Sequence, residues 1–139
     1  MTKNKAHPEL ENYCSQKIRL ENADDIYRFA LEADTVKKHA KIILLDKENY
    51  VLYVSHINDT MHNYNLVEVS FIIRMMIEFH AHSIIYIVNY PEGKTQPDKY
   101  DFGFKQQLRD ATFICGFLFK DYMLLNQQGY YSYAENRLI

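Results

Sequence analysis

Apolar positions along this chain follow two patterns: short apolar runs, typical of β-strands, and steps of three and four residues, typical of helices. Runs rich in β-branched and aromatic residues predict five strands, at 40–46, 50–57, 83–90, 117–125 and 130–135. Helical spacing predicts three helices: one near 22–34, one near 66–80, and a third that carries Phe104 to Cys115 on one face and ends at Gly116. The order α-β-β-α-β-α-β-β predicts an α/β fold, with a mixed β-sheet flanked by helices.

Capping and turn residues set the boundaries of these elements. Asn22 precedes two acidic residues and predicts the N-cap of the first helix. The clusters KEN at 47–49 and NQQG at 126–129 predict two hairpins, and Gly116 predicts the end of the third helix. The residues expected on the buried helix faces are Ile26, Phe29, Ala30, Leu66, Val69, Ile73, Met76, Ile77, Phe104, Leu108, Ala111, Thr112 and Cys115.

Length and charge limit the domain organisation, the ligands and the location that can be expected of this protein. The 139 residues, 47% hydrophobic and 24% charged, suit one compact domain, expected over 18–139 after a flexible N-terminal tail at 1–17. A net charge of −2 gives no sign of the basic patch typical of nucleic-acid binding. Arg74, Glu78 and His82 interrupt the longest apolar stretches, so no membrane span is predicted and a cytoplasmic location is expected.

The two cysteines, Cys14 and Cys115, are far apart and lie outside any Cys-x-x-Cys motif. Neither a disulfide framework nor a thiolate metal site is therefore indicated. Cys115 is expected to be a small apolar core residue of the third helix.

A segment between the third predicted strand and the third predicted helix carries a family resemblance. It contains VNYPEG at 88–93 and PDKYD at 97–101, with ten residues between Tyr90 and Asp101. It resembles the His-Asn-His-Pro-Ser-Gly and Pro-Ser-x-x-Asp segments of the RadC-type JAB domain, a bacterial branch of the JAMM (MPN-type) metallopeptidase fold. LLDKENYVL at 44–52, NDT at 58–60 and YYSYAENRLI at 130–139 are similar to further segments of that family, in the same order. The resemblance implies a JAB/MPN (cytidine-deaminase-like) architecture over 18–139.

The resemblance also implies what the loop has lost. In the family, two histidines at i and i+2 of a strand and the aspartate hold zinc, a glutamate is the general base, and a serine stabilises the oxyanion. Carried over by position, the histidines correspond to Val88 and Tyr90, the serine to Asp98 and the glutamate to Val54, while Asp101 is retained. The resemblance thus predicts a degenerate metal site without catalytic residues or zinc. The residues expected to shape the loop are Asn89, Pro91, Gly93 and Pro97.

Other side chains could still hold a metal. His80 and His82, with Glu78 nearby, form a His-x-His pair at a helix-to-strand junction, where the two rings need not face one point. Surface histidines that complement a helix dipole are the commoner outcome. The loop carboxylates that could gather around Mg²⁺ or Ca²⁺, or else lie in solvent, are those of Glu92, Asp98 and Asp101.

Aromatic residues are unusually many, with 12 Tyr, 8 Phe and no Trp. Core and sheet packing is expected to absorb most of them, and any exposed ones favour a protein partner over nucleic-acid stacking. The candidates are Tyr50, Tyr53, Tyr86, Tyr90, Tyr130, Tyr131 and Tyr133.

These observations predict a catalytically inactive RadC/JAB-like domain that acts as a binding or scaffold module, with either a protein partner or a homodimer left open. A metal-dependent, JAMM-type hydrolase with a relocated site is one alternative. A role associated with DNA repair is the other, and only the family resemblance implies it.

Overall fold

The computed structural model describes residues 17–31, 39–58, 66–89, 97 and 99–139. Within these ranges the predicted order of helices and strands is confirmed. The elements are α3 (Ala23–Leu31), β1 (His39–Leu45), β2 (Val51–Asn58), α4 (Leu66–Glu78), β3 (Ser83–Asn89), α5 (Lys99–Cys115), β4 (Leu118–Asn126) and β5 (Gly129–Ser132).

The strands form one five-stranded sheet in the order β2-β1-β3-β4-β5. Neighbouring strands are antiparallel except β3 and β4, which are parallel and are connected by α5. A parallel pair needs such a crossover, and the helix packs back onto the sheet. Every residue of β3 is buried, as suits the central strand of the sheet.

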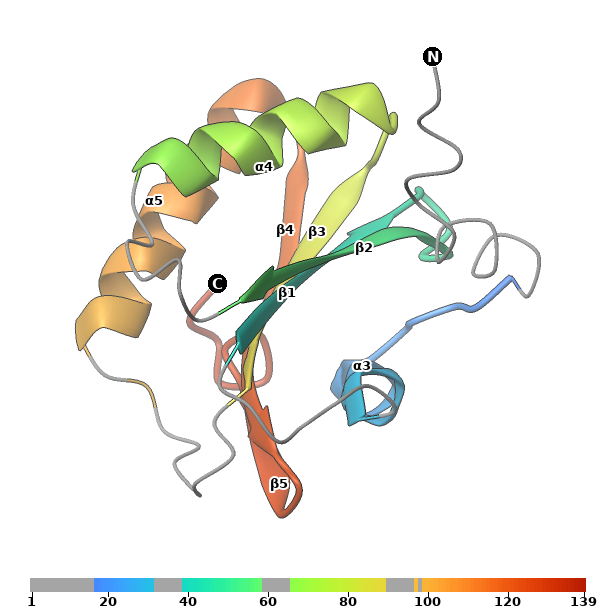
Figure 1. Ribbon diagram of the computed structural model, residues 1–139, viewed down its shortest axis with the longest axis vertical. Coiled ribbons are helices and arrows are strands. Elements are labelled where there is room, and N and C mark those ends of the chain that lie inside the picture. Colours follow the sequence, from blue (N-terminus) through green and yellow to red (C-terminus); the bar gives the residue numbers. More distant parts are fainter. Residues whose placement is uncertain (1–16, 32–38, 59–65, 90–96, 98) are drawn as a thin grey trace.

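Helices cover both faces of the sheet (Figure 1). The helices α4 and α5 lie on one face, here called the α5 face, and α3 lies on the other, called the α3 face. The core of the α5 face contains Ala40, Ile42, Leu44, Tyr53, Val69, Ile72, Met75, Met76, Ile84, Tyr86, Val88, Phe104, Leu108, Phe119, Tyr122, Leu124 and Tyr133. The core of the α3 face contains Leu20, Ala23, Ile26, Ala30, Ile43, Leu45, Val51, Val54, Ile85, Ile87, Met123 and Leu125.

The capping signals act as the sequence predicts. The side-chain Oδ1 of Asn22 accepts a hydrogen bond from the backbone N–H of Asp25 at 2.9 Å, which satisfies a free donor at the start of α3. Asn49 adopts φ 72° in the β1–β2 turn, and Gly116 adopts φ 80° at the end of α5. Left-handed backbone of this kind suits asparagine and glycine, so the local sequence ends these elements where it does.

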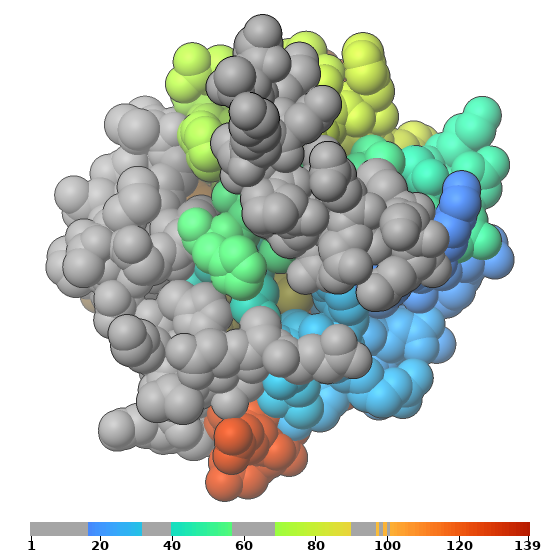
Figure 2. All heavy atoms as spheres, turned by 45° about the vertical axis from the view of Figure 1, so that its right-hand side comes forward, coloured from blue at the N-terminus to red at the C-terminus, as the bar shows by residue number. Residues whose placement is uncertain are grey.

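The tip of the β4–β5 hairpin projects at one end of the sheet (Figure 1) and lies next to α3 on the molecular surface (Figure 2). The rings of Tyr27 and Tyr130 lie 5.0 Å apart, and the Tyr27 hydroxyl donates to the carbonyl of Asn126 at 2.7 Å. These contacts attach α3 to the β4–β5 hairpin. In the described ranges, no helix combines the length and the apolar character needed to cross a membrane.

Two predicted core positions are wrong. Ile77 is 59% exposed, because α4 buries Val69, Ile72, Met75 and Met76 instead. The sequence of α4 is apolar around most of its circumference, so spacing alone did not select the buried side. Cys115, the last residue of α5, is exposed, three residues after the buried Thr112. The predicted tail at 1–17 lies outside the described residues, apart from Lys17.

Candidate functional site

The end of β3 and the start of α5 bring two of the predicted site residues to one face of the sheet. Val88 is buried in the core of the α5 face, beside Ile84 and Tyr86. Asp101 lies in the first turn of α5 and is only 4% exposed. The crossover explains this placement, because a helix that follows β3 and leads to a parallel neighbour must begin above the carboxyl end of β3.

Asp101 accepts a hydrogen bond from a tyrosine of the neighbouring strand. The hydroxyl of Tyr122, on β4, donates to Oδ1 of Asp101 at 3.1 Å, and both side chains are buried. Its position in the first turn also places the carboxylate near the positive end of the α5 dipole. A buried carboxylate needs such partners, since an unpaired one carries a large desolvation cost.

Tyr122 belongs to a packed set of aromatic rings, here called the tyrosine cluster: Tyr86, Tyr122 and Tyr133. The ring of Tyr122 stacks on that of Tyr86, with 5.2 Å between the ring centroids, and its centroid lies 4.9 Å from that of Tyr133. The ring centroid of Phe104, on α5, lies 4.9 Å from that of Tyr86, and the ring centroid of Phe102 lies 5.4 Å from that of Tyr133. Aromatic side chains therefore fill the space between β3, β4 and the start of α5.

The chemistry of this cluster keeps Tyr122 as a hydrogen-bond donor. Burial raises the pKa of the Tyr122 hydroxyl well above 10.0, and the charge of Asp101 raises it further. The phenol therefore stays protonated at neutral pH and continues to donate to Asp101. The pair is a hydrogen bond from a neutral phenol to the Asp101 carboxyl group, formed between two buried side chains.

The residues described at this site do not suit the zinc ion that the family resemblance implies. A catalytic zinc site uses three protein ligands with lone pairs and one open position. Val88 has no lone pair, and the carboxylate of Asp101 is engaged with Tyr122 within the tyrosine cluster. Elsewhere in the described residues, no three His, Cys, Asp or Glu side chains come together as a metal site would need. Tyr90, Pro91, Glu92, Gly93 and Asp98 lie outside the described residues.

Val54 is not brought to this site. It packs in the core of the α3 face, opposite Ile43 on β1, whereas Val88 and Tyr122 pack on the α5 face. Because side chains alternate along a strand, its neighbour Ser55 points to the α5 face instead. Ser55 pairs with Ile42, which pairs on its other side with Tyr86. A general base on β2 that faces Asp101 would therefore stand at Ser55.

The histidine pair lies at the other end of β3. His80 and His82 are exposed between α4 and β3, while Val88 is near the opposite, carboxyl end of that strand. Seven residues of extended strand span roughly 20 Å, so the pair is remote from Asp101. Of the predicted loop-shaping residues, Asn89 is buried at the end of β3 and Pro97 is half-buried.

A second buried carboxylate escaped the prediction. Asp121 on β4 accepts from the Ser132 hydroxyl at 2.5 Å, the Ala134 amide at 3.0 Å and the Tyr122 amide at 2.7 Å. Burial raises the pKa of the Asp121 carboxyl, and these hydrogen bonds oppose that shift. A charged residue inside the apolar run FLFKDYMLL was the available signal. These bonds fix β5 and the turn after it to β4.

The tyrosines are absorbed by the structure, as expected. Tyr53, Tyr86 and Tyr133 are buried, and the ring of Tyr53 stacks on Phe79 at 4.5 Å. The half-buried ones are Tyr50, Tyr130 and Tyr131. None of these six is an exposed platform for stacking bases.

The sequence pattern of the RadC-like JAB domain matches residues 20–138, which is most of the chain. The chain belongs to the RadC-like JAB domain family. The mixed sheet, with helices on both faces, is consistent with a JAB/MPN-like fold.

Curated relatives of this RadC-like JAB domain carry the name UPF0758 protein. The one from Chlorobium phaeovibrioides is 23% identical over 120 residues, covering 85% of this chain and 54% of the relative. The one from Streptococcus gordonii is 27% identical over 99 residues, covering 71% of this chain and 44% of the relative. The one from Thermotoga maritima is 25% identical over 130 residues, covering 93% and 57%. The chain thus spans about half the length of the curated relatives it matches.

Proposed function

We propose that this RadC-like JAB domain does not hydrolyse peptides and acts as a binding module. The observation that carries the proposal is the contact between Tyr122 and Asp101. The carboxylate that would serve as a zinc ligand is instead the buried acceptor of a phenol. On the same face of the sheet, the β3 residues Ile84, Tyr86 and Val88 are packed core residues.

Hydrolysis at such a site requires a metal-bound water and a general base within reach of it. Tyr122 cannot be that base at neutral pH, because its raised pKa keeps the hydroxyl protonated. Val54 faces away, and Ser55 has no carboxylate to accept a proton. The tyrosine cluster therefore supports a packed, apolar site in place of a reactive one.

Neither alternative function gains from the geometry. A relocated hydrolase site would use His80 and His82, yet both are exposed and the structure gives them no third ligand among the described residues. A role in DNA repair would call for a basic or aromatic surface, and the net charge of −2 gives no support for it. We therefore favour binding of a protein partner as the function.

A reconstruction tests the proposal. The double variant Val88→His with Tyr90→His should gain zinc binding, since residues i and i+2 of a strand point to one face and Asp101 lies on that face. The matched control is Val88→Leu with Tyr90→Phe, which changes the same positions without adding a ligand. Calorimetric zinc titration of both folded variants and the parent is the measurement. We expect binding in the histidine variant only, about 10–100-fold weaker than in a site whose ligands have supporting hydrogen bonds.

The general-base position can be tested on the same variant. Adding Asp98→Ser and Ser55→Glu should place a carboxylate on the α5 face, whereas adding Asp98→Ser and Val54→Glu should place it in the α3-face core. Only the Ser55 version is expected to show any peptidase activity above the parent. Peptidase activity in the zinc-loaded parent would overturn the proposed function. A folded double variant that binds no more zinc than the parent would show that positions 88 and 90 do not converge with Asp101.

A further inference from the structure

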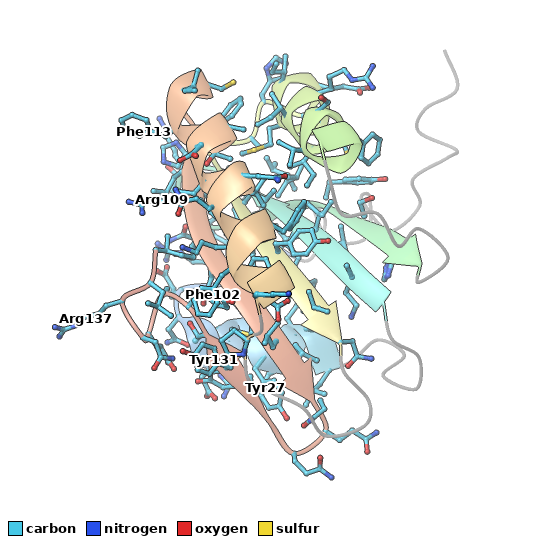
Figure 3. All side chains as sticks on the ribbon, turned by 90° about the vertical axis from the view of Figure 1, so that its left-hand side faces the viewer. Tyr27, Phe102, Arg109, Phe113, Tyr131 and Arg137 are labelled. Atoms are coloured by element: carbon cyan, nitrogen blue, oxygen red, sulfur yellow. The ribbon has the colours of Figure 1, made fainter. Side chains whose placement is uncertain are left out.

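The outward side of α5 carries large apolar side chains that are exposed, with Phe102 partly covered by the ring of Tyr133. Phe113 is 82% exposed and Ile114 is 81% exposed near the end of the helix, and Phe102 is 41% exposed near its start. Figure 3 shows Phe102, Arg109 and Phe113 at successive levels along the same side of α5. Two apolar ends with a polar middle are thus presented together on one helix side.

The spacing along this side has a symmetry. Phe102, Gln106, Arg109 and Phe113 follow at steps of four, three and four, which keeps them on one stripe of a helix. The order of residue types is aromatic, polar, polar, aromatic in both directions. A helix of this kind is complementary to a copy of itself turned end to end, as a two-fold interface requires.

Gly103 provides a second, independent observation. It lies in the second turn of α5, exposed, and a Cβ added there would meet nothing within 4 Å. Glycine destabilises a helix relative to alanine, and the contacts among the described residues give no reason for a glycine here. The absence of a side chain leaves bare backbone beside Phe102, against which a bulky group from outside can pack.

The polar middle of the stripe carries complementary charges. Arg109 is exposed, and within the described part of the chain no carboxylate pairs with its guanidinium. Asp110, one position further around the helix, is also exposed and accepts from Gln106 at 2.9 Å. One positive and one negative group therefore stand side by side in the polar middle of the stripe, between its two apolar ends.

We propose that a second copy of the chain docks on this surface, with the two α5 helices antiparallel and a two-fold axis near Leu108. In that arrangement Phe113 packs on Phe102 and Gly103 of the partner subunit. Arg109 comes within one helical turn of Asp110 of the partner subunit, and the symmetry forms the same contact twice. Ile114 extends the apolar contact at both ends.

The expected dimer is weak. A helix of 17 residues is roughly 25 Å long, and one helix pair buries less than the roughly 800 Å² per partner of a standard interface. The dimer should therefore dissociate reversibly on dilution. It does not depend on the proposed function, because the stripe lies on the outward side of α5 and Asp101 on its buried side.

Sedimentation velocity of the full chain over a wide range of concentration is the test. The parent should form a reversible dimer, and Phe113→Glu should weaken it at least about tenfold, since it sets an unpaired carboxylate against an apolar surface at each end of the contact. The matched control is Ile77→Glu, which changes an exposed apolar residue on α4, outside the stripe, and should leave dimerisation as in the parent. Circular dichroism verifies that each variant is folded.

A charge exchange identifies the contact itself. Arg109→Asp and Asp110→Arg should each be monomeric alone, because each sets like charges against one another across the two-fold axis. Mixed one to one, they should form a heterodimer, since both contacts then join opposite charges. A parent that stays monomeric at the highest concentration would overturn the proposal. So would a dimer that Phe113→Glu leaves unchanged, or a mixture that does not associate.

Discussion

Two buried aspartates lie on opposite faces of β4, and their surroundings differ. Asp121 is on the strand itself and accepts from one hydroxyl and two backbone amides. Asp101 is on the helix that crosses over the strand and accepts from the phenol of Tyr122. The donors to Asp121 come from β4 and the closing segment around β5, whereas the donor to Asp101 lies 21 residues away.

The difference shows what each carboxylate does. The hydrogen bonds of Asp121 hold the chain's last strand and turn in place, which is a structural role. Asp101 stands at a position that the family resemblance assigns to a metal ligand, yet its contact is with an aromatic cluster. A carboxylate at a ligand position is therefore not a ligand unless its neighbours also provide lone pairs, and the neighbours here are Val88 and the tyrosine cluster.

The largest expected effect is at Asp121. Asp121→Ala leaves the Ser132 hydroxyl and the amides of Ala134 and Tyr122 without their acceptor, and should lower the free energy of unfolding by about 3–5 kcal/mol. Urea unfolding measures it. Ser132→Ala is the control that removes one of these bonds and should cost about 1–2 kcal/mol. A loss below about 1 kcal/mol for Asp121→Ala would show that these bonds do not hold β5.

The next effect concerns Asp101 and Tyr122. Asp101→Ala leaves a buried phenol unsatisfied and should cost about 1–3 kcal/mol, while Asp101→Asn keeps an acceptor and should cost less. In a double-mutant cycle with Tyr122→Phe, the two side chains should couple by about 0.5–3 kcal/mol. Additive losses would mean that their hydrogen bond contributes nothing to stability.

Stability at alkaline pH should depend on the phenol of Tyr122, on the α5 face. The folded pKa of Tyr122 is raised above 10.0 by burial, so folding favours the protonated phenol. The protonated phenol contributes its full stabilisation of the folded state below pH 10. As the pH rises above 10, the free energy of unfolding should fall by at most about 1.4 kcal/mol per pH unit. Unfolding of Tyr122→Phe, compared with the parent from pH 8 to 11, should show a shallower loss. Parallel curves would contradict the assigned burial.

The smallest effect lies at acidic pH. Burial raises the folded pKa of Asp121 above its ordinary value of 3.8, so the folded state holds this proton more tightly than the unfolded state. The contribution of this group to stability should therefore decrease as pH rises from about 3.8 through the folded pKa. Asp121→Asn lacks this titration. The stability difference between parent and variant should move in favour of the variant across that window, as measured by urea unfolding.

The order of elements was predictable because each strand run and helix spacing has a distinct period and is bounded by residues such as Asn22, Asn49 and Gly116. The choice of face was not. Both sides of β2 are buried, so periodicity cannot tell Val54 from Ser55, and α4 is apolar around most of its surface, which led to the error at Ile77.

The candidate site was predictable only as a set of positions. The resemblance pointed to Val88 and Asp101, which the structure places on one face. The contact that gives the site its character, between Asp101 and Tyr122, forms across a parallel crossover. No local pattern in the sequence reveals it, because register between β3 and β4 decides that Tyr122 stacks beside Tyr86.

The most direct test of the central claim, that the tyrosine cluster has replaced the metal site, is the zinc content of the purified full chain. Protein produced with zinc in the medium is exposed to a mild chelator, and its metal is measured by mass spectrometry. We predict well under one zinc per chain, with the Val88→His and Tyr90→His variant as the positive control. Stoichiometric zinc that withstands the chelator in the parent would contradict the claim.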